Sequence, residues 1–107
     1  MVSMAQIEEL STRITRALDP ERIVLFGLYA RDEATEESDV DLLVVAETDL
    51  PAGERFGAVR RLAAEYPASF DIIVKTPAEY ARFRKVVNHI IYFAEKYGKT
   101  LYERRDA

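Results

Sequence analysis

Apolar residues recur along the chain with two different periods, and together they predict alternating helices and strands. From Ser3, a residue type that caps helices, to Asp19 and Pro20, apolar positions return at roughly helical spacing and predict a first helix that covers a sheet. Residues 22–27 and 39–45 are short, nearly continuous apolar runs. Their length and branched side chains favour two buried strands, of which the second is expected to be central.

The second half of the chain continues this alternation. A loop at residues 48–53 precedes an amphipathic helical pattern at residues 55–66, and residues 70–75 predict a third strand. Residues 76–98 have a helical pattern with a candidate break near Asn88. The remaining tail is expected to dock briefly and then fray. The prediction is an α/β (α+β) fold, in which helices flank a small mixed sheet of about three strands.

Three aspartates head the predicted second and third strands. Asp39 and Asp41 are two residues apart, so the period of a strand points both side chains to the same face. Gly27 lies beside them if the first two strands are antiparallel. Asp71 joins them if the second and third strands are parallel, with the helix between them as the crossover. This topology gathers the glycine turn and all three carboxylates at one edge of the sheet.

Carboxylates at such an edge fit a two-metal nucleotidyl-transfer site. Two magnesium ions about 3.5–4 Å apart stabilise the attacking and leaving oxygens of an in-line displacement. Asp39 and Asp41 are the candidate bridging ligands, and Asp71 is the candidate ligand and proton acceptor on the side of the nucleophile. A turn at Gly27 lets backbone N–H groups approach a triphosphate, and Arg31 is a candidate phosphate ligand.

Each of these residues also has a plainer interpretation. Paired aspartates before a strand are common turn features, Gly27 alone is typical of a turn, and Arg31 alone is typical of a solvated cation. His89, the one histidine, has no metal-ligand partner at suitable spacing and is expected to be surface-exposed or packed. The helical spacing of the later aromatic residues favours core or interface positions over base stacking, and an exposed patch among them would mark a protein partner. These residues are Tyr80, Phe83, Tyr92, Phe93 and Tyr97.

Length, charge and cysteine content narrow the possible classes of function. With 107 residues, the chain is expected to form one domain over residues 1–107. A formal net charge of -4 argues against a general nucleic-acid-binding surface, and no direct nucleic-acid contact is expected. The lack of cysteine excludes disulfides, a thiol nucleophile and cysteine-ligated zinc. No apolar run is long enough for a membrane span or a secretory signal, so we expect a cytoplasmic protein.

Residues 26–45 resemble the signature of the minimal nucleotidyltransferases (MNT) of the DNA polymerase beta superfamily. In that family Gly-Ser is followed, after ten residues, by Asp-any-Asp, and Gly27, Asp39 and Asp41 fit this spacing without a gap. The order of the predicted elements is similar over nearly the whole chain. The resemblance implies an antitoxin that binds Mg²⁺ and ATP and forms a hetero-oligomer with an all-helical HEPN ribonuclease toxin. In some members, neutralisation consists of transferring AMP to a tyrosine of the toxin.

The chain departs from this signature at position 28. Leu28 stands where the family has a serine whose hydroxyl binds a nucleotide phosphate, and Asp32 stands where a glycine is common. Loss of one such donor costs roughly 10²–10³ in rate, by analogy with oxyanion-hole donors. The positions that match the family's catalytic and metal-binding residues are Asp39, Asp41 and Asp71, and the positions expected at the nucleotide are Gly27, Leu28 and Arg31.

Two classes of function stay open on this sequence. In the first, the chain is a protein adenylyltransferase, and Asp39→Asn or Asp41→Asn abolishes transfer. In the second, it is a catalytically silenced binding module that neutralises its partner by occlusion, and the same variants still neutralise. Transfer to a small molecule such as an aminoglycoside is a weaker alternative, because those enzymes need an added substrate domain that this chain is expected to lack.

Overall fold

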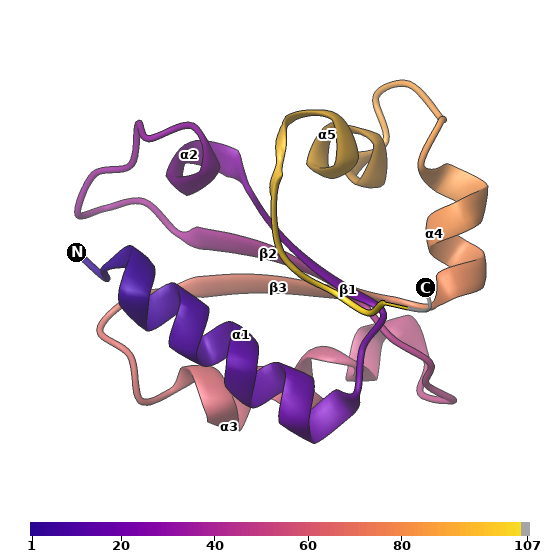
Figure 1. The fold of residues 1–107 in the computed structure, drawn as a ribbon, viewed down its shortest axis with the longest axis horizontal. Coiled ribbons are helices and arrows are strands. Elements are labelled where there is room, and N and C mark those ends of the chain that lie inside the picture. Colours follow the sequence, from indigo (N-terminus) through magenta and orange to yellow (C-terminus); the bar gives the residue numbers. More distant parts are fainter. Residues whose placement is uncertain (106–107) are drawn as a thin grey trace.

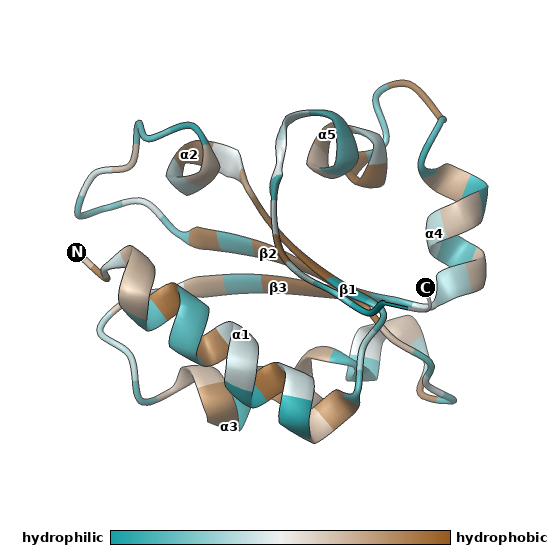
Figure 2. Cartoon of the chain, in the orientation of Figure 1, coloured by the Kyte–Doolittle hydropathy of each residue, from teal (hydrophilic) through white to brown (hydrophobic). Residues whose placement is uncertain are grey.

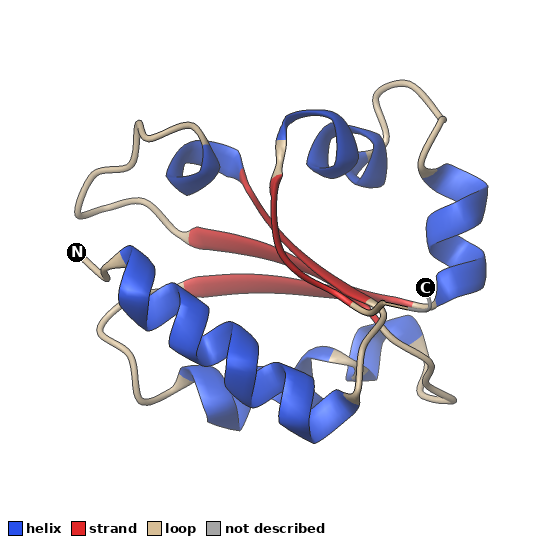
Figure 3. Cartoon of the chain, in the orientation of Figure 1, coloured by secondary structure: helices blue, strands red, loops and turns tan. Residues whose placement is uncertain are grey.

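A four-stranded mixed sheet lies between two groups of helices (Figure 1). The structure is a computed structural model, and it describes residues 1–105. The strand order across the sheet is β3-β2-β1-β4. Figure 3 shows how helices and strands alternate along the chain. The elements are α1 (Met4–Leu18), β1 (Arg22–Phe26), α2 (Gly27–Ala30), β2 (Val40–Val45), the 3₁₀ turn η1 (Ala52–Glu54), α3 (Phe56–Ala63), β3 (Phe70–Lys75), α4 (Pro77–Phe83), α5 (Ile90–Tyr97) and β4 (Lys99–Glu103).

The directions of the first three strands confirm the predicted topology. β1 pairs antiparallel with β2, and β2 pairs parallel with β3. Helix α3 lies in the connection between β2 and β3, where the crossover was expected. In this register Phe26 lies opposite Asp41, and Asp41 lies opposite Asp71. The starts of β2 and β3 therefore meet the end of β1 at one edge of the sheet.

The two faces of the sheet carry separate apolar clusters, because successive strand residues point to opposite faces. Ile23 and Leu25 of β1 belong to the cluster that α1 and α3 cover, whereas Val24 belongs to the cluster that α4 and α5 cover. Figure 2 shows that β1 and most of β2 and β3 are apolar, that β4 is largely polar, and that the helices alternate apolar and polar positions. Asp41 alternates with Leu43 along β2, which places the Asp41 side chain on the face covered by α5.

The sheet has one strand more than the sequence predicted. The tail was expected to dock briefly and then fray, whereas Lys99–Glu103 forms a full strand, β4, that pairs antiparallel with β1 across a register shift between Ile23 and Val24. Only Leu101 and Tyr102 gave an apolar signal there, whereas the strand is held by backbone pairing and by an ion pair between Arg22 and Glu103 at 3.1 Å. The backbone groups of a sheet edge can pair with almost any sequence, so hydropathy alone did not reveal this strand.

The helical pattern at residues 76–98 is divided into two helices, and the break lies where the sequence indicated it. Asn88 has a left-handed backbone with φ of 71°, which an α-helix cannot accommodate. His89 then begins α5, because its Nδ1 accepts a hydrogen bond from the Ile91 N–H at 3.2 Å. The His89 ring also stacks on Phe83, with ring centroids 4.5 Å apart. His89 is therefore a packed helix cap, in agreement with the expectation that it is surface-exposed or packed.

A buried arginine joins the crossover to β3 and α4. The Arg55 guanidinium donates hydrogen bonds to the carbonyl oxygens of Leu50 and Val74 at 2.9 and 3.2 Å, and it pairs with Glu79 at 2.6 Å. Glu79 also closes the capping box of α4 with Thr76. These contacts hold the far end of β3, the strand that carries Asp71.

Among residues 1–105, no helix is both long and apolar enough to cross a membrane.

Candidate functional site

Three aspartates lie together where β2 and β3 begin. Asp41 and Asp71 are register partners on neighbouring parallel strands, which places their backbones about 5 Å apart. Asp39 precedes β2, and the alternation of the strand directs it to the same face as Asp41. Asp41 is half-buried, while Asp39 and Asp71 are exposed. The site is therefore open to solvent at two of its three carboxylates.

The electrostatics of Asp41 show that the three carboxylates act on one another. Burial, together with the negative charges of Asp71 and Asp39, raises the pKa of Asp41 to about 6. Within the described part of the chain, no group of three or more His, Cys, Asp or Glu side chains is drawn together tightly enough to hold a metal ion. In this acidic cluster, the charges of Asp71 and Asp39 disfavour the ionised form of Asp41, and a cation nearby would favour it.

Gly27 lies against the Asp41 carboxylate. It has a φ of 72°, in the left-handed region that favours glycine, and a Cβ atom added there would lie 2.2 Å from Oδ2 of Asp41. The end of β1 thus passes against the carboxylate with no room for a side chain. The glycine that the sequence singled out as a turn residue is also a contact residue of the acidic cluster.

Gly27→Ala is expected to destabilise the protein by about 1–3 kcal/mol, because a positive φ strains any residue with a Cβ. The added methyl group should also displace the Asp41 carboxylate. Chemical denaturation measures the change in unfolding free energy, and Gly57→Ala is the matched control. A Cβ at Gly57, inside α3, meets no atom within 4 Å. That variant should be slightly more stable than the wild type. Equal stabilities for the two variants would contradict this account of Gly27.

Lowering the pH from 7 to 5 is expected to stabilise the protein in the absence of divalent cations. The folded state raises the pKa of Asp41 from 3.8 to about 6, so the folded protein binds this proton more tightly than the unfolded chain does. The penalty of a charged Asp41 is complete above pH 6 and is relieved as the pH falls through that value. Because Asp41 is partly exposed, solvent screening reduces the effect to about 1 kcal/mol.

Denaturation curves at several pH values, with a chelator present, measure this effect. Glu79 contributes with the opposite sign, since hydrogen bonds from Thr76 and Arg55 lower its pKa below 4.5, so its stabilisation is lost only at more acidic pH. Asp41→Asn should remove the gain between pH 7 and pH 5, whereas Asp49→Asn, in an exposed loop, should keep it. If Asp41→Asn still gains stability between pH 7 and pH 5, the gain comes from another titratable group.

The residues of α2 lie at the rim of the acidic cluster. Leu28 is 42% exposed, and its backbone carbonyl accepts hydrogen bonds from the N–H groups of Arg31 and Glu33. The Arg31 guanidinium is exposed and lies 3.5 Å from the Glu33 carboxylate, a surface pair of little energetic weight. Asp32 adopts a φ of 57°, which explains physically why glycine suits this turn. Arg31 is therefore able to turn toward an anion at the rim.

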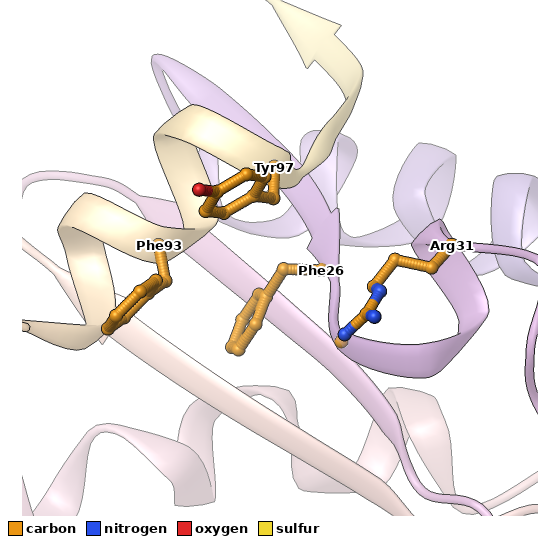
Figure 4. Close-up of a pocket in the computed structure, with 5 residues that line it drawn as sticks. Phe26, Arg31, Phe93 and Tyr97 are labelled. Atoms are coloured by element: carbon orange, nitrogen blue, oxygen red, sulfur yellow. The ribbon is translucent and has the colours of Figure 1, made fainter.

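A pocket of about 500 Å³ opens beside the cluster, and it contains residues that the sequence did not assign to the site. Phe26 occupies its middle, with Phe93 and Tyr97 of α5 on one side and Arg31 on the other (Figure 4). Gly27 completes the lining. The spacing of Phe93 and Tyr97 had favoured core or interface positions. The missed signal was their separation of four residues, which puts both rings on one face of a helix.

Comparison with known proteins assigns the family. The family model of the nucleotidyltransferase domain matches residues 5–100. The chain belongs to the nucleotidyltransferase family. Two proteins of Methanocaldococcus jannaschii, each named "Putative protein adenylyltransferase", are similar to this nucleotidyltransferase. One is 33% identical over 85% of this chain and 86% of its own length. The other is 34% identical over 63% of this chain and 62% of its own length.

Solved structures with lower sequence identity show the same fold. A toxin-antitoxin crystallised with AMP-PNP superposes with a TM-score of 0.67 at 22% identity, covering 92% of this nucleotidyltransferase and 75% of that chain. A variant of the MntA-HpeT toxin-antitoxin superposes with a TM-score of 0.62 at 19% identity, covering 98% and 76%. A nucleotidyltransferase-fold structure from Sulfolobus solfataricus gives a TM-score of 0.64 at 21% identity, covering 92% and 78%. The mixed α/β fold is therefore that of known nucleotidyltransferases.

Proposed function

We propose that this protein is an MNT-type antitoxin of the cytoplasm that binds Mg²⁺ and ATP and transfers AMP to a tyrosine of a HEPN-type toxin. The observation that supports the proposal most is the side-by-side register of Asp41 and Asp71, with Gly27 against the Asp41 carboxylate. This edge of the sheet offers carboxylate oxygens next to a turn in which Gly27 leaves the backbone uncovered by a side chain. Both features suit a bound metal-triphosphate complex.

The donor set fits magnesium, which prefers hard oxygen ligands and uses one or two carboxylates together with substrate phosphates. The raised pKa of Asp41, caused by burial and by the charges of Asp71 and Asp39, is the condition that a divalent cation relieves. Asp39, Asp41 and Asp71 would hold the metal. When bound, Mg²⁺ would neutralise phosphate charge and stabilise the attacking and leaving oxygens of the displacement.

The remaining roles fall to groups at the rim. Asp71 is exposed to an incoming partner, and it would accept the proton of the attacking tyrosine hydroxyl. That hydroxyl oxygen forms a bond to the α-phosphorus of ATP, the bond to the bridging oxygen breaks, and pyrophosphate leaves. Backbone N–H groups that follow Gly27 and the Arg31 guanidinium would bind the phosphates.

The partner is proposed from the relatives. The names of the archaeal relatives support a protein as the acceptor, and the structural neighbours that are toxin-antitoxins support a toxin as that protein. The alternative is a module that neutralises its partner by occlusion, without transfer. Leu28 favours this alternative, because it stands where the signature has the phosphate-binding serine hydroxyl.

Co-expression with the product of the neighbouring gene, as the candidate toxin, separates the two functions. If transfer neutralises the toxin, the wild type restores growth, Asp39→Asn does not, and the toxin recovered from wild-type cells gains the mass of AMP. If Asp39→Asn also restores growth while still binding the toxin, occlusion accounts for the neutralisation and the proposed transfer is wrong. The variant should fold normally, since Asp39 is exposed and lies outside the strand.

A further inference from the structure

The pocket at the end of β1 is continuous with the acidic cluster. Phe26 lines the pocket and is the register partner of Asp41, and Gly27 both lines the pocket and contacts the Asp41 carboxylate. Any molecule with one part bound at the carboxylates and another part several ångströms away is thereby directed into this pocket. Its volume of about 500 Å³ is in the range of small-molecule sites.

Aromatic rings make up most of the pocket lining. Phe93 and Tyr97, one helical turn apart on α5, hold their rings nearly parallel, 19° from coplanar, with centroids 6.3 Å apart. They are 42% and 58% exposed, which is unfavourable for large apolar side chains unless something covers them. Phe26 supplies a third ring, and Arg31 faces the rings across the opening (Figure 4). Flat apolar faces suit a flat aromatic ligand, and Arg31 at the rim remains available to the phosphates.

We infer that this pocket binds the base of a purine nucleoside triphosphate by stacking on Phe93, Tyr97 and Phe26. The inference rests on the proposed function, because the triphosphate is what the acidic cluster would hold. The five lining residues include no amide or carboxylate side chain that would read the hydrogen-bonding edge of a base. The pocket therefore selects by ring area, so ATP and GTP bind with similar affinity and CTP binds more weakly.

A protein partner is the competing occupant of the same surface. Val87 and Ile90 are exposed apolar residues before and at the start of α5 that a partner could also cover. However, neither residue lines the pocket, whereas Arg31 and Gly27, which do, belong to the rim of the acidic cluster. The pocket is thus linked to the carboxylates more closely than to these two apolar residues, which favours the base over a protein surface.

Calorimetric titration of the purified protein with Mg²⁺ and ATP, GTP, CTP or inorganic tripolyphosphate tests the inference. Tripolyphosphate has no base and therefore reports on the phosphate site alone. Phe93→Ala and Tyr97→Ala should each weaken ATP and GTP by about 5- to 100-fold, the effect of removing one stacking ring. Both variants should bind tripolyphosphate like the wild type, and Tyr97→Phe, which keeps the ring, should bind ATP like the wild type.

Ile90→Ala is the matched control, since Ile90 is 41% exposed on the same helix but does not line the pocket. It should leave the affinity for ATP unchanged. If Phe93→Ala and Tyr97→Ala bind ATP as tightly as the wild type, the base lies elsewhere and the inference is wrong, whether or not these variants lose binding to a toxin. If the wild type binds neither ATP nor tripolyphosphate, the proposed function fails as well. Circular dichroism confirms that each variant is folded.

Discussion

Asp41→Asn is expected to abolish nucleotidyl transfer and, at the same time, to make the metal-free protein more stable. Removing a group that only orients a metal ligand already costs about 10–100-fold in affinity or activity, so removing a proposed ligand costs more. The gain in stability arises because asparagine removes a partly buried charge and, with it, the repulsion from Asp71 and Asp39, the two causes of the raised pKa of Asp41. At pH 7 the gain should be about 1 kcal/mol after screening by solvent.

The two effects are measured on the same samples. Denaturation in a chelator gives the unfolding free energy, and a second series with Mg²⁺ shows whether the metal stabilises each protein. Mg²⁺ should raise the stability of the wild type and of Asp49→Asn, and it should have no effect on Asp41→Asn. An Asp41→Asn protein that is less stable than the wild type, or that still transfers AMP, would contradict the role given to this carboxylate.

Leu28→Ser is expected to raise the rate of transfer by roughly 10²–10³, the value of one donor to a developing charge. Position 28 follows Gly27, and under the proposed match to the signature Leu28 supplies an apolar side chain in place of a serine hydroxyl. The Leu28 side chain is 42% exposed, so its loss removes little core packing. The change should therefore act on the chemistry and leave the stability nearly unchanged.

Transfer rates and ATP affinity of Leu28→Ser, measured beside Leu50→Ser, test this prediction. Leu50 is equally exposed, at 42%, but it lies in the loop before η1, at the opposite end of β2 from Asp41. Leu50→Ser should behave like the wild type. If Leu28→Ser raises neither the affinity for ATP nor the rate of transfer, position 28 does not limit the reaction. Leu28 then no longer supports a catalytically silenced module.

The central part of the fold could be predicted because its sequence signals are local. The apolar runs at β1, β2 and β3 have the length and branching of buried strands, and the positions of Gly27, Asp41 and Asp71 relative to those runs fixed the strand directions that the structure has. The chemistry of the residues thus supplied a topology that hydropathy alone did not provide.

The C-terminal elements were harder to predict, for two physical reasons. β4 is held by pairing with the edge of β1, and backbone pairing leaves little trace in side-chain composition. The exposure of Phe93 and Tyr97 depends on how α5 is rotated against the sheet. Gly98, at the end of α5, lets the chain approach β1 closely because it has no side chain. A Cβ on Gly98 would lie 2.5 Å from Val24. Helical spacing places the two rings on one side of α5, but it does not tell whether the core or a pocket lies on that side.

Label transfer from radioactive ATP to protein is the most direct test of the acidic cluster as a nucleotidyl-transfer site. The purified protein is incubated with Mg²⁺ and α-labelled ATP in extract from its own host, alongside Asp39→Asn and Leu28→Ser. The account predicts label on a protein with the wild type, more label with Leu28→Ser, and none with Asp39→Asn. Label that persists with Asp39→Asn, or that is absent from all three reactions, would contradict it.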